Sequence, residues 1–128
     1  AQHWEQIIIS ACEQCGRNRV PGVSSPVTLS SWLSRQGAMQ KELNNEPTKI
    51  LYFMLSPTSK MGLHDFSKSL SVTELALLVG PEGGFTSDED AAALMAGFSS
   101  LRLGSRTLRT ESAALAAIAA LQTIWGDY

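Results

Sequence analysis

Two glycine-containing segments of this chain carry residue types that suit the binding of a small ligand. The first, Gly80-Pro81-Glu82-Gly83-Gly84, follows one apolar run, and the second, 103–113, follows another. Glycine lets backbone amides and carbonyls approach a ligand without a Cβ in the way, and proline fixes one φ angle. By itself such a segment is more often a simple tight turn. It also lacks the lysine and hydroxyl residue of a phosphate-binding loop and the spacing Gly-x-Gly-x-x-Gly of a dinucleotide-binding turn.

Arginines supply a second kind of candidate chemistry. Arg17 and Arg19 stand two residues apart, and Arg102, Arg106 and Arg109 lie close together beside the second glycine segment. The planar, permanently charged guanidinium suits contacts with phosphate groups or with a base. Without the neighbouring motifs, both groups of arginines are more typical of a solvated surface.

Cys12 and Cys15 have the spacing Cys-x-x-Cys, which suits a redox pair or half of a zinc site. A structural zinc site needs about four ligands, and the sequence adds only His3 and His64, which are far apart. Because residues three apart on a helix share one face, the sequence favours two small buried side chains. We therefore expect no metal.

The bulk composition indicates one ordinary domain. The chain has 128 residues, and its 10 basic and 12 acidic residues give a net charge of -2, which argues against a protein held to nucleic acid by charge alone. There is no secretory signal, and the longest apolar stretch, 113–121, falls short of the roughly 20 residues that span a bilayer. We expect a cytoplasmic protein without membrane contact. The helical pattern starts within a few residues of Ala1, which we interpret as the start of a fragment.

Periodicity and capping residues predict helices that alternate with strands. The expected helices span 3–14, then Ser30 or Ser31 to Gln36, then from a Thr86 capping box to about Ala96, and finally 110–125. The expected strands span 49–55, 75–79 and 99–103, and residues 59–68 read as a loop with a helical turn at most. Strands that are apolar on both faces indicate a mostly parallel sheet flanked by helices, an α/β fold. The carboxyl ends of such strands meet at one edge, so 55–57, 80–84, 103–104 and 108–111 should form one pocket.

The pocket segments together resemble a known family. Three strings carry the resemblance, namely Val79-Gly-Pro-Glu-Gly-Gly-Phe-Thr, Leu103-Gly-Ser-Arg-Thr-Leu-Arg-Thr-Glu-Ser-Ala and Glu13-Gln-Cys-Gly-Arg-Asn-Arg-Val-Pro. They resemble the small-subunit ribosomal RNA methyltransferase E family, which consists of uridine-N3 methyltransferases of the knotted SPOUT class. The resemblance covers nearly the whole chain. It implies an S-adenosylmethionine-dependent enzyme that methylates N3 of a uridine in 16S ribosomal RNA of the small subunit and acts as a homodimer. It also implies a trefoil knot near the carboxyl terminus, which periodicity could not have indicated.

The resemblance implies a set of methyl-donor contacts, made mostly through the backbone. They are Leu55, Ser56, Pro57, Gly80, Pro81, Glu82, Gly83, Leu103, Gly104, Leu108, Arg109, Thr110, Glu111 and Ala113. It also implies a catalytic set of Arg17, Arg19, Arg109 and Glu111, in which the arginines hold RNA or stabilise the uracil anion. Glu82 and Glu111 are the only carboxylates inside the two motifs. Either could remove the N3 proton, but a structural role is favoured for both.

The chain departs from the family pattern in mild ways and in one large way. Cys15, Thr107 and Ser112 replace residues that are usual there, without loss of chemistry. The family also carries an amino-terminal β-barrel RNA-binding domain and an opening strand and helix that this sequence lacks. We therefore expect 1–128 to be one SPOUT methyltransferase domain that is incomplete at its amino terminus and binds the donor without turnover.

Two other functions stay open at this point. One is a related knotted methyltransferase that acts on a ribose hydroxyl or on transfer RNA. The other is a non-catalytic module for nucleotide binding or dimerisation. For the homodimer that the resemblance implies, the candidate interface residues are Ile124, Trp125 and Tyr128, which could equally belong to the core.

Overall fold

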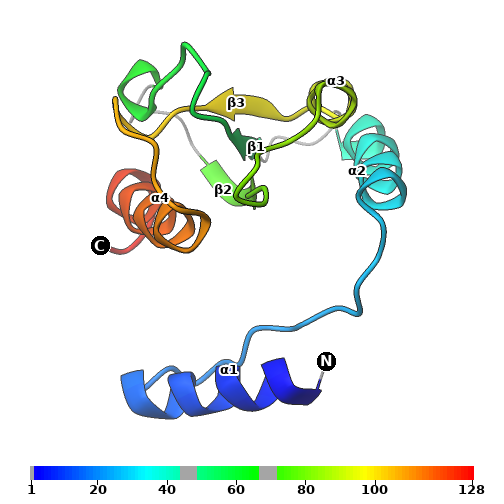
Figure 1. Cartoon of the computed structure of the whole chain (residues 1–128). Coiled ribbons are helices and arrows are strands. Elements are labelled where there is room, and N and C mark those ends of the chain that lie inside the picture. The colour runs from blue at the N-terminus through cyan, green and yellow to red at the C-terminus, as the bar shows by residue number, and fades with distance from the viewer. Residues whose placement is uncertain (1, 44–48, 67–71) are drawn as a thin grey trace.

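Three parallel strands organise the chain. The computed structural model describes residues 2–43, 49–66 and 72–128. Strand β1 (Lys49–Leu55) lies between β2 (Val72–Leu78) and β3 (Ser99–Leu101), and both pairings are parallel. Helix α4 (Thr110–Trp125) covers one face of this sheet, and α2 (Leu29–Leu43) and α3 (Ser87–Met95) lie on the other side (Figure 1). The predicted α/β fold with a parallel sheet flanked by helices is confirmed.

The central strand is buried on both faces because its side chains alternate between two apolar clusters. Met54, 2% exposed, packs with Leu33 of α2 and with the buried alanines of α3. Phe53, 1% exposed, points the other way and packs with Leu101 and with Leu121 of α4. A strand that is apolar throughout is what a sheet covered on both sides requires.

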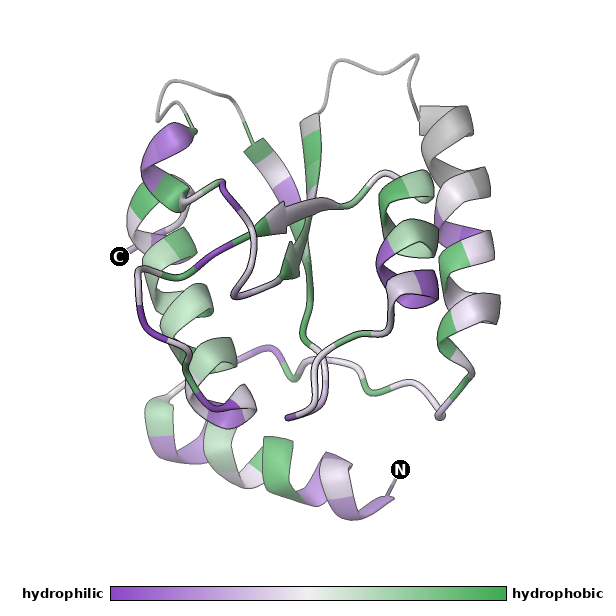
Figure 2. Cartoon of the chain, turned by 45° about the horizontal axis from the view of Figure 1, so that its top comes forward, coloured by the Kyte–Doolittle hydropathy of each residue, from purple (hydrophilic) through white to green (hydrophobic). Residues whose placement is uncertain are grey.

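The first and last helices lie where the sequence predicted helices, at 3–14 and 110–125. Helix α1 (Gln2–Cys15) is followed by Gly16 with φ +78°, the left-handed conformation that commonly ends a helix. An extended segment then leads to α2, and α1 lies apart from the sheet and its covering helices (Figure 1). Green hydrophobic and purple hydrophilic bands alternate along α1 in Figure 2.

Two details of the terminal helices differ from what the sequence favoured. Cys12 is buried at 6% exposure, but Cys15, the last residue of α1, is exposed, so the expected buried pair is wrong. Among the candidate interface residues, Trp125 stacks against Phe53 at a ring-centroid distance of 6.4 Å and belongs to the core. Tyr128, by contrast, is 74% exposed.

Helix α2 begins earlier and ends later than predicted. Its first turn is capped by Thr28, whose Oγ1 accepts a hydrogen bond from the Ser31 backbone N–H at 3.3 Å, so neither Ser30 nor Ser31 is the cap. The helix also continues past Gln36 and over Gly37. A Cβ at Gly37 would lie 3.8 Å from the Cα of Ala96, so this position faces the end of α3 closely. Gly37 therefore lies inside α2 and does not end the helix.

Helix α3 begins at the predicted capping box. The Glu89 N–H donates to Thr86 Oγ1 at 3.2 Å, and the Thr86 N–H donates to Glu89 Oε1 at 2.8 Å. These two bonds satisfy amides that the first turn would otherwise leave free. The helix closes at Ala96 and the chain leaves it through Gly97, with φ +96°.

The outer strands depart from their expected bounds. Strand β2 begins at Val72, earlier than predicted, and is only half-buried, with Thr73 and Glu74 exposed. The expectation that it is buried on both faces is therefore wrong, because β2 forms an edge of the described sheet. Strand β3 is shorter than predicted and ends at Leu101, after which Arg102 forms a single parallel bridge with Gly62.

Candidate functional site

Three segments that follow the strands enclose a cavity of about 660 Å³. This volume falls in the range of pockets that bury small molecules. Most of the lining residues come from the segment after β1, the segment between β2 and α3, and the segment between β3 and α4, and a few come from the adjoining strands and from the first turns of α3 and α4. The lining residues are Leu55, Ser56, Pro57, Thr58, Val79, Gly80, Pro81, Glu82, Gly83, Gly84, Phe85, Asp90, Leu101, Leu103, Arg106, Thr107, Leu108, Arg109, Thr110 and Ala113.

The wall after β1 is anchored to β3. The Ser56 N–H donates to the Leu101 carbonyl at 2.9 Å, and Ser56 Oγ lies 3.1 Å from Thr58 Oγ1. Further along, the hydroxyls of buried Ser59 and of Ser100 lie 2.9 Å apart. These contacts hold the wall after β1 at a fixed position beside the neighbouring strand.

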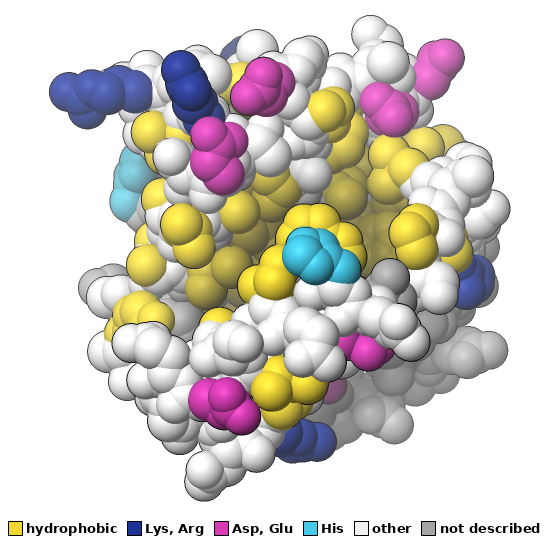
Figure 3. Space-filling model, turned by 60° about the horizontal axis from the view of Figure 1, so that its bottom comes forward, with side chains coloured by type: hydrophobic (Ala, Val, Ile, Leu, Met, Phe, Trp, Pro, Cys, Tyr) yellow, Lys and Arg dark blue, Asp and Glu magenta, His cyan; other side chains and the backbone are white. Residues whose placement is uncertain are grey.

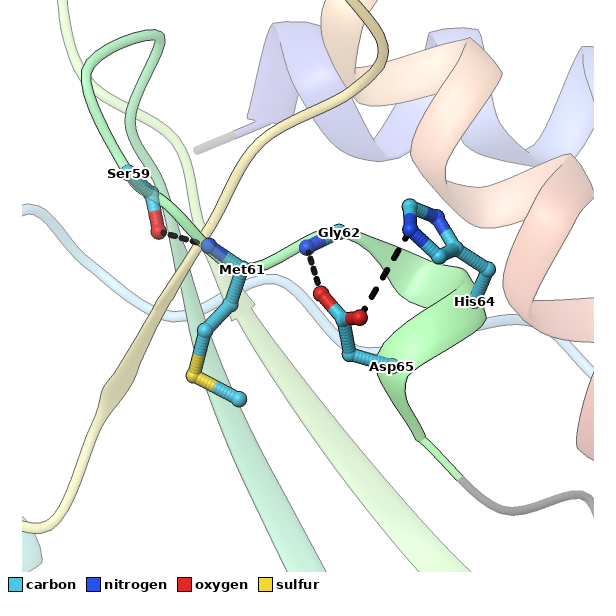
Figure 4. A network of polar contacts seen from close by, with 5 residues as sticks. All are labelled: Ser59, Met61, Gly62, His64 and Asp65. Carbon is cyan, nitrogen blue, oxygen red and sulfur yellow. Dashed lines mark hydrogen bonds and ion pairs between the residues drawn. The ribbon is translucent and has the colours of Figure 1, made fainter.

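A short polar network stabilises the continuation of this wall (Figure 4). The Met61 N–H donates to Ser59 Oγ at 3.2 Å, and the Gly62 N–H donates to Asp65 Oδ2 at 2.8 Å. His64 Nε2 lies 3.6 Å from Asp65 Oδ1. The network folds 59–65 into the short η1 turn (Leu63–Asp65), which agrees with the expected loop and helical turn.

The wall after β2 is built from backbone. The Gly84 N–H donates to the Pro81 carbonyl at 2.9 Å, which closes a turn, and Gly84 has φ +76°. The ring of Phe85 folds back so closely that a Cβ at Gly80 would lie 2.9 Å from it. At Gly83 a Cβ would meet no atom within 4 Å, so the backbone there faces open space. This wall can therefore present peptide groups directly to a ligand.

The wall before α4 carries the polar side chains of Arg106, Thr107 and Arg109. Gly104 turns the chain with φ +70°, and Arg109 is the N-cap residue directly before α4. Thr110 Oγ1 donates to the Gly80 carbonyl at 3.1 Å, which joins this wall to the one after β2. The amino-terminal turn of α4 opens beside the cavity, and such turns leave backbone N–H groups free for ligand atoms.

Loss of the Thr110 hydroxyl should loosen the cavity. We expect Thr110→Val, which keeps the shape of the side chain, to lower the free energy of unfolding by about 1 kcal/mol because the Gly80 carbonyl loses its donor. Urea denaturation measures this change. Thr110→Ser keeps the hydroxyl and should lie close to the parent chain, so equal losses in the two variants would contradict the role of the bond.

The structure brings most of the predicted donor contacts together, but not all. Every predicted contact lines the cavity except Gly104 and Glu111. Gly104 acts through its turn, and Glu111 is exposed in the first turn of α4. Arg17 and Arg19 lie outside the lining, in the extended segment after α1, where Arg17 Nε donates to the Arg19 carbonyl at 2.9 Å. Of the predicted catalytic set, only Arg109 faces the cavity.

Several lining residues are not among the donor contacts that the resemblance implied. They are Thr58, Val79, Gly84, Phe85, Asp90, Leu101, Arg106 and Thr107. Most of them stand inside or next to the two glycine segments, so their position in the sequence was a usable signal. Asp90 is different, because it reaches the cavity from α3, and only the packing of that helix against the sheet decides where its side chains face.

The face seen in Figure 3 is hollowed, and hydrophobic side chains line the hollow, with acidic and basic side chains at its rim. Among the residues that the structure describes, no group of three or more His, Cys, Asp or Glu side chains could hold a metal ion. In the same described ranges, no helix combines the length and apolar character needed to cross a bilayer.

Comparisons with known proteins agree with one another. The family model described as an RNA methyltransferase domain matches residues 1–122. The ribosomal RNA small subunit methyltransferase E of Buchnera aphidicola subsp. Schizaphis graminum is 39% identical over 125 residues, which cover 98% of this chain and 46% of that protein. The chain thus spans about half the length of the curated relatives it matches.

Solved structures show the same likeness. A crystal structure of a ribosomal RNA small subunit methyltransferase E from Neisseria gonorrhoeae, bound to S-adenosyl methionine, superposes with a TM-score of 0.81 at 39% identity over 99% of this chain and 48% of that one. A structure from Legionella pneumophila with the bound cofactor SAM has a TM-score of 0.81 at 36% identity and covers 99% of this chain and 47% of that one. The fold, the cavity and these relatives together show that the chain belongs to the RNA methyltransferase domain family.

Proposed function

We propose that this chain is the S-adenosylmethionine-binding domain of an enzyme that methylates N3 of a uridine in 16S ribosomal RNA. The observation that carries the proposal is the cavity of about 660 Å³ between the three segments that follow the strands, lined by nearly all the residues expected to hold the methyl donor. The names of the relatives and the ligand in two solved structures support the same activity.

The cavity fits such a donor in its chemistry. Open space lies in front of the Gly83 backbone, so peptide groups can bind polar edges of a ligand directly. Leu55, Leu103 and Leu108 supply apolar walls of the kind that hold an adenine ring. S-adenosylmethionine supplies an already activated methyl group, so the protein has mainly to align the target nitrogen and help remove its proton.

We favour an arginine as the group that stabilises the negative charge on the uracil ring during the reaction. Arg109 and Arg106 line the cavity and are exposed, so they can reach a substrate that enters from outside. A guanidinium close to the uracil ring stabilises the negative charge that develops when N3 loses its proton. Glu111 is exposed and outside the lining, which supports a helix-terminal role for it over that of a base.

The proposal extends to the organisation of the enzyme. It includes a trefoil knot formed by the carboxyl-terminal segment, a homodimer, and action on small ribosomal subunits in the cytoplasm. It treats 1–128 as one methyltransferase domain. The support is the likeness to ribosomal RNA small subunit methyltransferase E proteins, among them the Buchnera protein, which is 39% identical over 125 residues.

Calorimetry on the folded chain tests the donor site. Both S-adenosylmethionine and its demethylated product should bind, with one site per chain. No binding of either compound would contradict the proposed site. Methyl transfer from labelled donor to unmodified small subunits, followed by nucleoside analysis, then separates N3 methylation of uridine from methylation of a ribose hydroxyl or of transfer RNA.

Arg17 and Arg19 should matter for RNA and not for the donor. In the enzyme that contains this domain, we expect Arg17→Ala and Arg19→Ala each to lower the rate of methylation by about 100-fold, because a charged contact to RNA is lost. Donor binding should be unchanged, since neither residue lines the cavity. Arg35→Ala, which removes an exposed arginine on α2, is the matched control. Unchanged methylation in both arginine variants would remove this pair from the mechanism.

A further inference from the structure

Four charged residues line the cavity, and one of them is in a different environment from the rest. Glu82, Arg106 and Arg109 are exposed, whereas Asp90 is half-buried. Water and salt screen an exposed charge strongly and a partly buried one much less. Asp90 is therefore the charge in the lining with the strongest influence on what the cavity holds.

The capping of α3 does not use the Asp90 carboxylate. Thr86 and Glu89 form the capping box, through bonds of 3.2 Å and 2.8 Å. Asp90 uses its backbone N–H in the helix, as a donor to the Thr86 carbonyl at 2.9 Å. Within the described part of the chain, no cation or hydrogen-bond donor is paired with its carboxylate. The negative charge is thus available to a ligand.

An acidic first turn also stabilises a helix through its dipole, and this effect needs no ligand. Asp88 provides the comparison, because it stands in the same first turn but is exposed and lies outside the cavity lining. The two residues share the dipole effect and differ in what they face. Any effect on a ligand that Asp90 has and Asp88 lacks belongs to the cavity.

We propose that Asp90 is a specificity-determining residue that makes the cavity prefer the charged methyl donor over its demethylated product. The inference rests on the proposed function. When the methyl group forms its bond to uridine N3, whose proton leaves, the bond from sulfur to that methyl breaks and its electron pair stays on sulfur. The sulfonium becomes a neutral thioether, so the bound molecule loses one positive charge. The attraction to Asp90 falls at the same moment, which favours release of the product.

Calorimetry with the full 128-residue chain tests this preference. The affinities for S-adenosylmethionine and for S-adenosylhomocysteine are measured in the parent chain, in Asp90→Asn and in Asp88→Asn. We expect Asp90→Asn to lower the ratio of donor affinity to product affinity by about three- to tenfold, the size expected when one partly screened charge is removed. Asp88→Asn should leave the ratio unchanged. Asp90→Ala also removes the charge and should repeat the result.

The measured affinities distinguish failure of the proposed donor site from failure of the role of Asp90. If the parent chain binds neither compound, the proposed function fails and the role of Asp90 fails with it. If the parent chain binds both compounds and the two Asp90 variants change the affinity ratio no more than Asp88→Asn does, the proposed function stands and the role of Asp90 is overturned.

Discussion

Replacing Leu101 with alanine should lower the free energy of unfolding by about 3 kcal/mol. Leu101 ends β3 with no exposed surface and packs with Phe53 and Leu121 between the sheet and α4. Its removal leaves a void that tightly packed neighbours fill only in part. The expected loss is a large fraction of the roughly 5–15 kcal/mol that stabilises a typical domain. Urea denaturation followed by circular dichroism measures it.

Leu115→Ala is the matched control for this core substitution. Leu115 is 72% exposed on α4, so the same change of side chain should cost less than about 0.5 kcal/mol. Equal losses at the two positions would show that the cluster around Phe53 is not the core of the fold. Because Leu101 also lines the cavity, its alanine variant should bind the methyl donor more weakly as well.

Gly83→Ala should weaken binding of the methyl donor by at least about tenfold and leave the free energy of unfolding unchanged. A Cβ at Gly83 meets no atom within 4 Å, and its backbone is not in the left-handed region, so the free protein accepts alanine without strain. The added methyl group would instead occupy space that a ligand needs when it approaches the backbone. Calorimetry and urea denaturation on the same samples separate the two effects.

Gly80→Ala and Gly22→Ala are the comparison variants for this prediction. At Gly80 the new Cβ would lie 2.9 Å from the ring of Phe85, which packs against the cluster around Met54. Gly80→Ala should therefore weaken donor binding and also lower the free energy of unfolding by about 1–2 kcal/mol. Gly22 has open space as well but lies outside the cavity, so Gly22→Ala should change neither property. Normal donor binding in Gly83→Ala would show that the ligand does not approach this wall.

Features that depend on neighbours in sequence were predictable. The box of Thr86 and Glu89 lies within one helical turn, and its two hydrogen bonds form as expected. The apolar run of β1 indicated a strand covered on both faces, and Phe53 and Met54 are buried on opposite sides of it. The shared cavity followed because parallel strands place their carboxyl ends at one edge.

Features that depend on distant contacts were not predictable. The sequence predicted that the second helix ends at Gln36, but α2 continues through Gly37, where it faces Ala96 at the end of α3. The half-burial of β2 depends on its place in the strand order, which no local pattern contains. Asp90 was missed for a similar reason, since the sequence indicates its helix but not the direction in which that helix presents it. The assigned roles of Arg17 and Arg19 remain predictions.

The bond between Thr110 and Gly80 has a consequence for how the chain folds. It joins positions 30 residues apart, and the contact between Ser59 and Ser100 joins positions 41 apart. Such distant contacts form late, because closing a long loop costs entropy before the contacts compensate for it. A chain in which α4 has not docked against the sheet therefore has an incomplete cavity. A ligand held between these walls binds only the finished fold, and at 100 times its Kd it stabilises that fold by about 2.7 kcal/mol.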